Sequence, residues 1–381
     1  MSEVSRSASP PDAGELDAEA VAALVNGSHD LAADGRMDEA VRDLRRAVPA
    51  ARRLFARDPV RHRTVLVVAL RNLEGRLAAT GRAEETVPLL REIVEATAGY
   101  RDEEVANGTR DALQSHRIGA LTRLARRLRA AGDLDGAIAA ATTARDESPR
   151  PADPPVPGDA AKVERLVACE LLLGRLLEDA GRVEESIRVG ESAAAHARLC
   201  DDTVQLADAA LDLGLRLLAQ DRLDDAAERL RQAVEAYRDH AEDPGRPDAR
   251  ANLAVAANRL GVALSMRERD GEAVPYFEEA VRQHRRRDAA DPEVRDELAG
   301  SLRDLAVCLI QLDRDAEAVA ALTESAELYR PAARDGSRFH RRRLAEVLNR
   351  LWRGLAILGR EEESASVKAE WSALAGVSPS P

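Results

Sequence analysis

The sequence contains almost no lysine. Of its 56 lysine and arginine residues, only Lys162 and Lys368 are lysine. A phosphate-binding loop requires a glycine-rich segment that ends in Lys-Ser or Lys-Thr, whereas Lys162 precedes Val163 and Lys368 precedes Ala369. The sequence therefore excludes such a loop, and lysine-dependent chemistry has almost no residue to use. The codon usage of a GC-rich genome is the simplest explanation of the arginine bias.

Aromatic residues make up only 2% of the chain. Sheets favour aromatic and β-branched residues, so a chain rich in Ala and Leu predicts a core of thin, close-packed helices. An α/α-barrel enzyme is the main catalytic alternative. Such barrels line their cavity with aromatic residues, and here Trp352 and Trp371 both lie near the C-terminal end. We therefore predict no enzymatic activity and no cofactor.

The cysteines are also few. Cys169, Cys200 and Cys308 are far apart in the sequence, so they form neither a disulfide framework nor a zinc pattern, and a reducing compartment is expected. None of the seven histidines is followed by glutamate, which excludes the His-Glu-x-x-His zinc motif. We expect surface or packing roles for the histidines. His284 stands at the same place in its repeat as Tyr237 and Tyr329, which favours packing.

Long apolar runs are absent as well. No run approaches the roughly 18 apolar residues of a membrane span, and the first residues lack the apolar core of a signal peptide. The net charge of −12 argues against a general binder of nucleic acids or anionic membranes. We predict a cytoplasmic protein whose partners include neither nucleic acids nor membranes.

What the sequence does contain is a repeated helical hairpin, clearest over residues 298–330. Its first half places leucines at spacings of three and four, which puts them on one helical face: Leu298, Leu302, Leu305, Leu309 and Leu312. Asp313-Arg314-Asp315 interrupts the apolar pattern, and Ala318, Val319, Leu322, Ala326 and Tyr329 resume it. So short a break predicts two antiparallel helices.

This hairpin recurs along the chain, with eight turns 40 to 51 residues apart. The turn residues are Gly35, Gly81, Gly132, Gly181, Asp221, Glu268, Asp313 and Gly359. Four residues before each turn stands a leucine: Leu31, Leu77, Leu128, Leu177, Leu217, Leu264, Leu309 and Leu355. Small residues recur seven before and five after most turns, where the two helices must cross. The pattern predicts an all-α protein, an α-solenoid of about eight hairpins and sixteen helices.

The repeats resemble the tetratricopeptide repeat (TPR) family. Leu260-Gly261, Leu264, Ala273, Phe277 and Ala280 match the family's pattern of large and small residues. The period is longer than the family's usual 34, so each helix is expected to be longer. The closer likeness is to long-period, Ala/Arg-rich bacterial repeats. The resemblance implies a right-handed superhelix, and a protease, an NTPase or a regulator encoded nearby is an expected partner.

The hairpins suggest a division of the chain into five segments. We expect disordered tails at 1–13 and 376–381, TPR-like repeats 1–3 at 14–147, and repeats 4–8 at 160–375. Residues 148–159 are proline-rich and cannot continue a helix. They are interpreted as a loop between repeats, with a hinge or an extended segment docked in the groove as the alternative.

Three repeats depart from the pattern at the position seven before the turn, where Ser28, Glu74 and Trp352 replace a small residue. Packing of their two helices is therefore in question. Paired carboxylates follow several turns, for example Asp38-Glu39 and Glu184-Glu185. They resemble acid/base pairs, but they lie in the first turn of a helix, where negative charge complements the helix dipole. We expect them to be structural.

By resemblance to the family, the first helix of each hairpin lines a groove, with positions 13, 10, 9 and 6 before the turn exposed in it. We call these the groove positions. Besides the ten residues named next, the groove positions include one further arginine, Arg353, and four acids: Asp208, Asp212, Asp304 and Glu346. The predicted partner-binding residues are Arg71, Asn72, Arg123, Arg126, Arg175, Asn258, Arg259, Arg303, Asn349 and Arg350.

Arginine binds carboxylates in a bidentate manner, so these residues suggest a groove for an acidic peptide or a C-terminal carboxylate. The alternative is that they are solvated charges balanced by neighbouring acids. The Lys and Asn combination of the family's carboxylate clamp is missing. Two functions remain: a scaffold or adaptor that binds a protein or peptide, and a regulatory sensor whose superhelix changes shape on binding. Arg123→Glu with Arg126→Glu is expected to abolish binding without unfolding the array.

Overall fold

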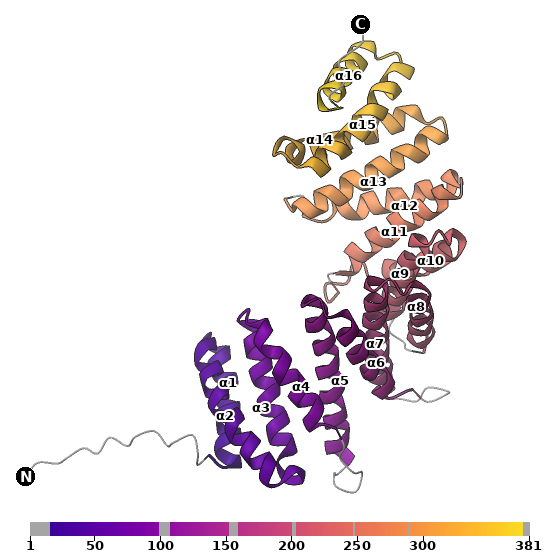
Figure 1. Cartoon of the computed structure of the whole chain (residues 1–381). Helices are drawn as coiled ribbons and strands as arrows, with labels where there is room; N and C mark the ends of the chain where they lie inside the picture. The colour runs from indigo at the N-terminus through magenta and orange to yellow at the C-terminus, as the bar shows by residue number, and fades with distance from the viewer. Residues whose placement is uncertain are drawn as a thin grey trace, which may run out of the picture. The chain divides into compact units, whose positions relative to one another are not determined.

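The computed structural model describes residues 16–98, 107–151, 159–199, 203–246, 248–288 and 290–375, and within these it contains sixteen α-helices, one 3-10 helix and no strand (Figure 1). The first eight helices are α1 (Ala18–Ala33), α2 (Met37–Arg57), α3 (Pro59–Ala79), α4 (Thr86–Ala96), α5 (Asn107–Ala130), α6 (Leu134–Glu147), α7 (Ala160–Asp179) and α8 (Val183–Ala197); the 3-10 helix η1 (Ala83–Glu85) precedes α4. The others are α9 (Thr203–Ala219), α10 (Leu223–Arg238), α11 (Asp248–Met266), α12 (Asp270–Arg285), α13 (Pro292–Gln311), α14 (Asp315–Arg334), α15 (Arg338–Ile357) and α16 (Glu361–Ala375). The predicted all-α solenoid of eight hairpins is confirmed.

The chain forms two compact units, residues 1–189 and 190–381, and the point of division lies within α8. In the first unit each helix packs on the next from α1 to α7. In the second unit the same order holds from α9 to α16. The predicted tails lie outside the described residues, as do residues 152–158 of the predicted loop or hinge, so those assignments stay predictions.

All eight turns have the same backbone geometry. The turn residue has a positive φ, between 71° and 83° at the five glycines and between 56° and 58° at Asp221, Glu268 and Asp313. The N–H of the next residue donates to the carbonyl of the leucine four before the turn, at 2.8 to 3.0 Å, as from Arg36 to Leu31. This bond satisfies a carbonyl that the end of the first helix would otherwise leave unpaired. The recurring leucines thus mark the turns as well as the core.

An ion pair then starts the second helix of seven hairpins. The arginine after the turn contacts a carboxylate three residues later, at 2.6 to 2.7 Å. In the first of these pairs the Arg36 hydrogen bond lowers the pKa of Glu39. The third hairpin differs, because Asp133 takes the arginine's place and accepts from the Gly136 N–H at 2.9 Å. One carboxylate of each predicted pair is therefore engaged at a helix start, which confirms a structural role.

Small residues hold the two helices of each hairpin close together. All eight residues five after the turn are buried: Ala40, Thr86, Ala137, Ser186, Ala226, Ala273, Ala318 and Ser364. The residue seven before the turn faces the residue nine after it. A Cβ on Gly261 would lie 2.8 Å from the Phe277 ring, and one on Gly214 would lie 2.7 Å from the Leu230 side chain. A Cβ at either of these two crossings would therefore require the facing side chain to shift.

The three departures from this pattern are each accommodated differently. Ser28 is fully buried and donates to the Val25 carbonyl of its own helix at 2.6 Å. Glu74 is buried and forms an ion pair with an arginine of the next hairpin. Trp352 lies beneath the Lys368 ammonium, 5.3 Å from its ring, at the position where other hairpins place two packed side chains. The helices of these hairpins pack despite the larger residue.

His284 occupies the packing position that its place in the repeat predicts, since it is 3% exposed, as Tyr329 is, while Tyr237 is fully buried. Burial, with a smaller effect from Arg287, lowers the pKa of His284 to about 4. In the unfolded chain the His284 imidazole takes up a proton near pH 6.5, whereas in the folded chain it stays neutral until about pH 4. The contribution of His284 to the free energy of unfolding is therefore present above pH 6.5 and is lost as the pH falls toward 4.

We expect His284→Tyr to remove part of the pH dependence of stability. Tyrosine fills the same position in two sister hairpins and carries no charge at acidic pH. The wild-type chain should lose roughly 2–3 kcal/mol between pH 6.5 and 4 through this histidine alone. Urea unfolding at pH 7 and at pH 4.5 gives the comparison. An identical loss in both proteins would show that His284 is not the responsible group.

Candidate functional site

The predicted partner-binding residues of the first unit lie on α3, α5 and α7, and only part of them is available to a partner. Arg71 and Arg126 are exposed. Neither has an ion-pair partner within the part of the chain that the structure describes. Asn72 is buried, and its Nδ2 donates to the Val68 carbonyl of its own helix at 2.8 Å. Arg175 is exposed on α7. The first unit therefore offers single exposed arginines rather than the predicted arginine and asparagine pairs.

Arg123 holds a buried carboxylate. Its Nε lies 3.0 Å from Oε2 of Glu74, which is only 3% exposed. His116 lies close by, and its pKa is lowered by burial and by the charges of Arg71 and Arg123. Arg123 thus compensates the charge of Glu74 in the helix crossing, and its side chain has a structural task that the sequence did not indicate.

A chain of polar contacts crosses from α11 to α13 in the second unit. The Nδ2 of Asn258 donates to Ser301 Oγ at 3.3 Å and to Asp304 Oδ2 at 3.4 Å. The guanidinium of Arg303 contacts Oδ1 of the same aspartate at 2.7 Å. Arg259 is exposed beside this chain. Two predicted residues, Asn258 and Arg303, are therefore brought together by Asp304.

The hydroxyls of buried tyrosines reach the same helical faces. The Tyr237 hydroxyl donates to Asp208, and Asn252 Nδ2 donates to the Tyr237 oxygen at 3.4 Å. Tyr329 in the equivalent place has its hydroxyl 3.7 Å from where a Gly300 Cβ would lie. Sequence reasoning missed this contribution of the second helix. The sequence could have predicted it, because each tyrosine stands sixteen residues after a turn and lies against the residue thirteen before the same turn.

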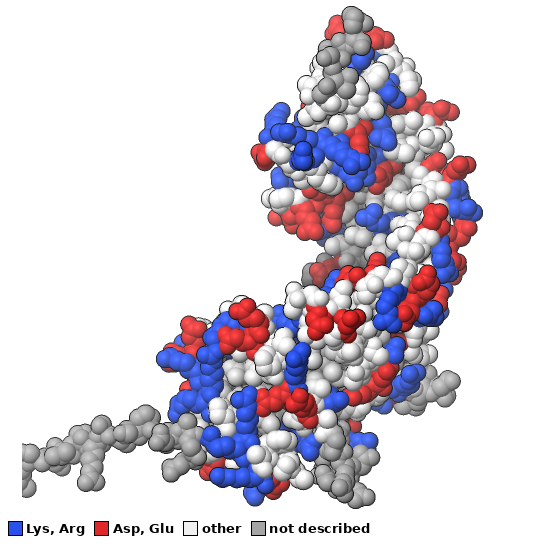
Figure 2. Space-filling view, viewed as in Figure 1, with Lys and Arg blue, Asp and Glu red and all other residues white. Residues whose placement is uncertain are grey.

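The last hairpin presents a strongly basic α15, and Figure 2 shows Lys and Arg gathered over α14 and α15. Asn349 accepts from the Trp352 indole N–H at 3.2 Å, so its amide oxygen is engaged within the helix. Arg350 is exposed and donates to the Glu346 carbonyl at 3.2 Å. Of the predicted residues on α15, Arg350 is therefore the one that faces solvent.

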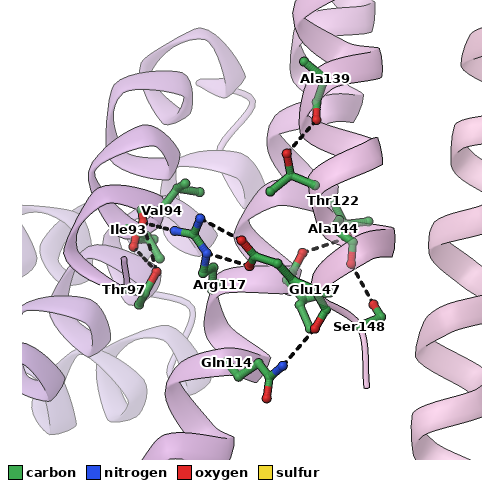
Figure 3. Close-up of polar contacts among 12 residues, drawn as sticks. Ile93, Val94, Thr97, Gln114, Arg117, Thr122, Ala139, Ala144, Glu147 and Ser148 are labelled. Carbon is green, nitrogen blue, oxygen red and sulfur yellow. Dashed lines mark hydrogen bonds and ion pairs between the residues drawn. The ribbon is translucent and has the colours of Figure 1, made fainter. Parts of the chain in front are cut away.

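A second polar cluster ties three helices together and is structural (Figure 3). Arg117 of α5 contacts the Glu147 carboxylate at the end of α6, at 2.6 Å, and also donates to the Val94 carbonyl of α4. Gln114 donates to the Glu147 carbonyl at 2.8 Å. These bonds satisfy carbonyls at the ends of α4 and α6. The cluster fixes the end of α6, which precedes the proline-rich segment, and joins it to α4.

Neither a metal site nor a membrane span is found in the described ranges. Among these residues, no group of three or more His, Cys, Asp or Glu side chains could hold a metal ion. None of the described helices is long and apolar enough to cross a membrane.

Comparison with known proteins identifies the repeat. Residues 253–287 match the model of the tetratricopeptide repeat family. The crystal structure of the apo form of RapI is 13% identical with a TM-score of 0.54, over 83% of this chain and 78% of RapI. BtubC (BKLC) from P. vanneervenii is 18% identical with a TM-score of 0.49, over 67% of this chain and 92% of BtubC. No curated protein matches the chain. The likeness to RapI shows a shared helical-repeat fold.

Proposed function

We propose that this chain of helical hairpins, one of which matches the TPR family model, is a non-enzymatic scaffold that binds a protein or peptide through its groove positions. Within each unit, stacked hairpins expose a helical face that packing does not use. The proposal places the chain in the cytoplasm and takes a protein or peptide with exposed carboxylates as partner. A protease, an NTPase or a regulator encoded nearby is the first candidate to test.

The observation that carries this proposal is the exposed Arg259 beside the polar contacts that join α11 and α13. Asn258, Ser301 and Asp304 link the two helices through side chains, while Arg259 beside them stays exposed. Asn258 and Ser301 are buried, so the guanidinium of Arg259 is the group there that is open to the carboxylates of a bound peptide. Arg71 and Arg126 of the first unit, taken by itself, are exposed arginines of the same kind.

Arg126→Glu with Arg259→Glu is expected to abolish capture of the partner and leave the fold intact, because both side chains are exposed. The matched control is Arg57→Glu with Arg188→Glu, which makes the same charge change on exposed positions of α2 and α8. The measurement is affinity capture with the full chain, followed by circular dichroism of each variant. A stoichiometric protein retained equally by both pairs would refute the groove positions as the binding surface.

The sensor function stays a separate prediction. A short peptide that produces a large compaction in small-angle scattering would favour it over the scaffold. Binding without a change in the scattering curve would favour the scaffold.

A further inference from the structure

The arginines of α15 differ from those of the other basic helix in what they contact. Each helix carries six arginines and one carboxylate. On α5, neighbouring helices supply carboxylate partners: Arg117 contacts Glu147 at 2.6 Å, Arg123 contacts Glu74 at 3.0 Å and Arg129 contacts Asp179 at 2.6 Å. On α15, the single carboxylate of the helix, Glu346, is the only one in ion-pair contact with its arginines among the described residues. The charge of α15 is thus largely uncompensated.

Carboxylates on the helices around α15 already have other partners. Asp296 of α13 lies 2.6 Å from His340 Nε2, and Asp304 of α13 lies 2.7 Å from Arg303. Glu370 of α16 lies 3.0 Å from Arg330 of α14. None of these three carboxylates forms an ion pair with an arginine of α15.

These arginines form a stripe along one side of the helix. The spacing of three and four residues aligns Phe339, Arg342, Arg343, Glu346, Arg350 and Arg353 on one face. The buried residues of α15, including Leu344, Leu348, Leu351 and Leu355, lie on the other side. Arg342, Arg350 and Arg353 are exposed. We call this set of six the arginine stripe.

An exposed aromatic ring marks the N-terminal end of the stripe. Phe339 is 56% exposed, and the Arg343 guanidinium lies over its ring, 5.3 Å from the centroid. An exposed ring beside several arginines offers an apolar contact together with several charge-assisted hydrogen bonds. From Phe339 to Arg353 the helix rises about 21 Å, at 1.5 Å per residue. An extended peptide covers this distance with about six or seven residues.

We propose that the arginine stripe of α15 binds an acidic segment of a partner protein, about seven residues long, with several side-chain carboxylates and one apolar residue that contacts Phe339. The inference rests on the proposed scaffold function and assigns its acidic ligand to the last hairpin. A peptide can place a neutral residue opposite Glu346. A continuous phosphate backbone places a negative charge there, so it fits the stripe less well than such a peptide.

The test uses the full chain and a fluorescein-labelled peptide of seven residues, with a leucine at one end, a glutamine at the centre and glutamate at the other five positions. A peptide with glutamine in place of every glutamate is the control probe. By anisotropy, we expect the glutamate probe to bind at least tenfold more tightly than the glutamine probe at low salt. Its affinity should fall severalfold when the salt concentration rises, because ion pairs at the surface are screened. Equal binding of the two probes would overturn the proposal.

Substitutions locate the site. Arg342→Gln with Arg350→Gln and Arg353→Gln should weaken the glutamate probe more than tenfold. The control triple, Arg57→Gln with Arg91→Gln and Arg188→Gln, changes the net charge equally on exposed positions of α2, α4 and α8 and should stay within twofold. Equal losses would mean that the probe senses only net charge, which would overturn the stripe.

A probe with a photo-reactive group at its centre tests the site without any substitution, and so remains decisive if the stripe variant unfolds. Adducts on peptides of α15 support the proposal. Adducts on α3, α5 or α11 overturn it while supporting the scaffold function at the other groove positions. Displacement of the probe by oligouridine RNA at lower concentration than by unlabelled peptide would overturn it in favour of a nucleic-acid site. Partner capture that depends on Arg259 but not on the stripe likewise separates the two proposals.

Discussion

Arg123→Glu is expected to lower the free energy of unfolding by about 2–3 kcal/mol, because it places a second carboxylate against the buried Glu74. A fully buried pair broken in this way loses about 3–5 kcal/mol, and the estimate here is smaller because the Arg123 side chain is 36% exposed. Urea unfolding followed by circular dichroism measures the effect. Arg126→Glu, on an exposed position of the same helix, should change stability by less than about 0.5 kcal/mol.

Glu74→Ala provides the matching rescue. Ala125 and Ala306 hold the equivalent position in two other hairpins, so alanine fits this crossing. In the Glu74→Ala background, Arg123→Glu should cost little, since no buried charge remains to be repelled. The same loss in both backgrounds would contradict the role of the ion pair. This contact also revises the expectation from sequence that Arg123→Glu with Arg126→Glu leaves the array folded.

Gly261→Ala is expected to destabilise the second unit by about 2–3 kcal/mol, at the upper end of the range for overpacking. The added Cβ would lie 2.8 Å from ring atoms of Phe277, which is 1% exposed and has no space to move. Thermal unfolding of the variant measures the loss. Gly271→Ala is the control, because a Cβ there has nothing within 4 Å and alanine favours the helix.

Phe277→Leu should partly rescue Gly261→Ala. The pair Ala306 and Leu322 occupies the same two positions in the next hairpin, where both residues are buried. Phe277→Leu alone should cost about 1 kcal/mol through lost packing, and the double variant should lose less than the sum of the two singles. Strict additivity would show that these two side chains are not the ones in conflict.

The sequence predicted the hairpins well because each depends on local signals. A leucine four before every turn and a small residue five after it both determine and reveal the same geometry, and the structure confirms both positions in all eight hairpins. Helix length followed from the spacing of the turns. At three turns Asp221, Glu268 and Asp313 stand in place of glycine and adopt its positive-φ backbone conformation. These turns could be recognised in the sequence only because the leucines and small residues around them keep the repeat pattern.

The candidate site was less accessible to sequence reasoning, because its contacts join residues of different hairpins. Arg123 meets Glu74 across 49 positions of the sequence, and Asn258 meets Asp304 across 46. Periodicity places such residues on the correct helix and indicates nothing about their partner. The same holds for α5 and α15, which have the same charge: neighbouring helices supply carboxylates to arginines of α5, whereas arginines of α15 form ion pairs only with Glu346 of their own helix among the described residues.

The identical turns have a genetic consequence. Because every turn starts from the same leucine carbonyl and ends at the same helix start, an exchange of DNA between any two turns joins a first helix to a second helix at matching points. Loss of residues 269–313, for example, would place α14 after α11, with Gly261 opposite Leu322. Whole repeats can therefore be gained or lost in evolution while the hairpins remain intact, and the outermost hairpin, with its basic α15, can be inherited or replaced as one piece.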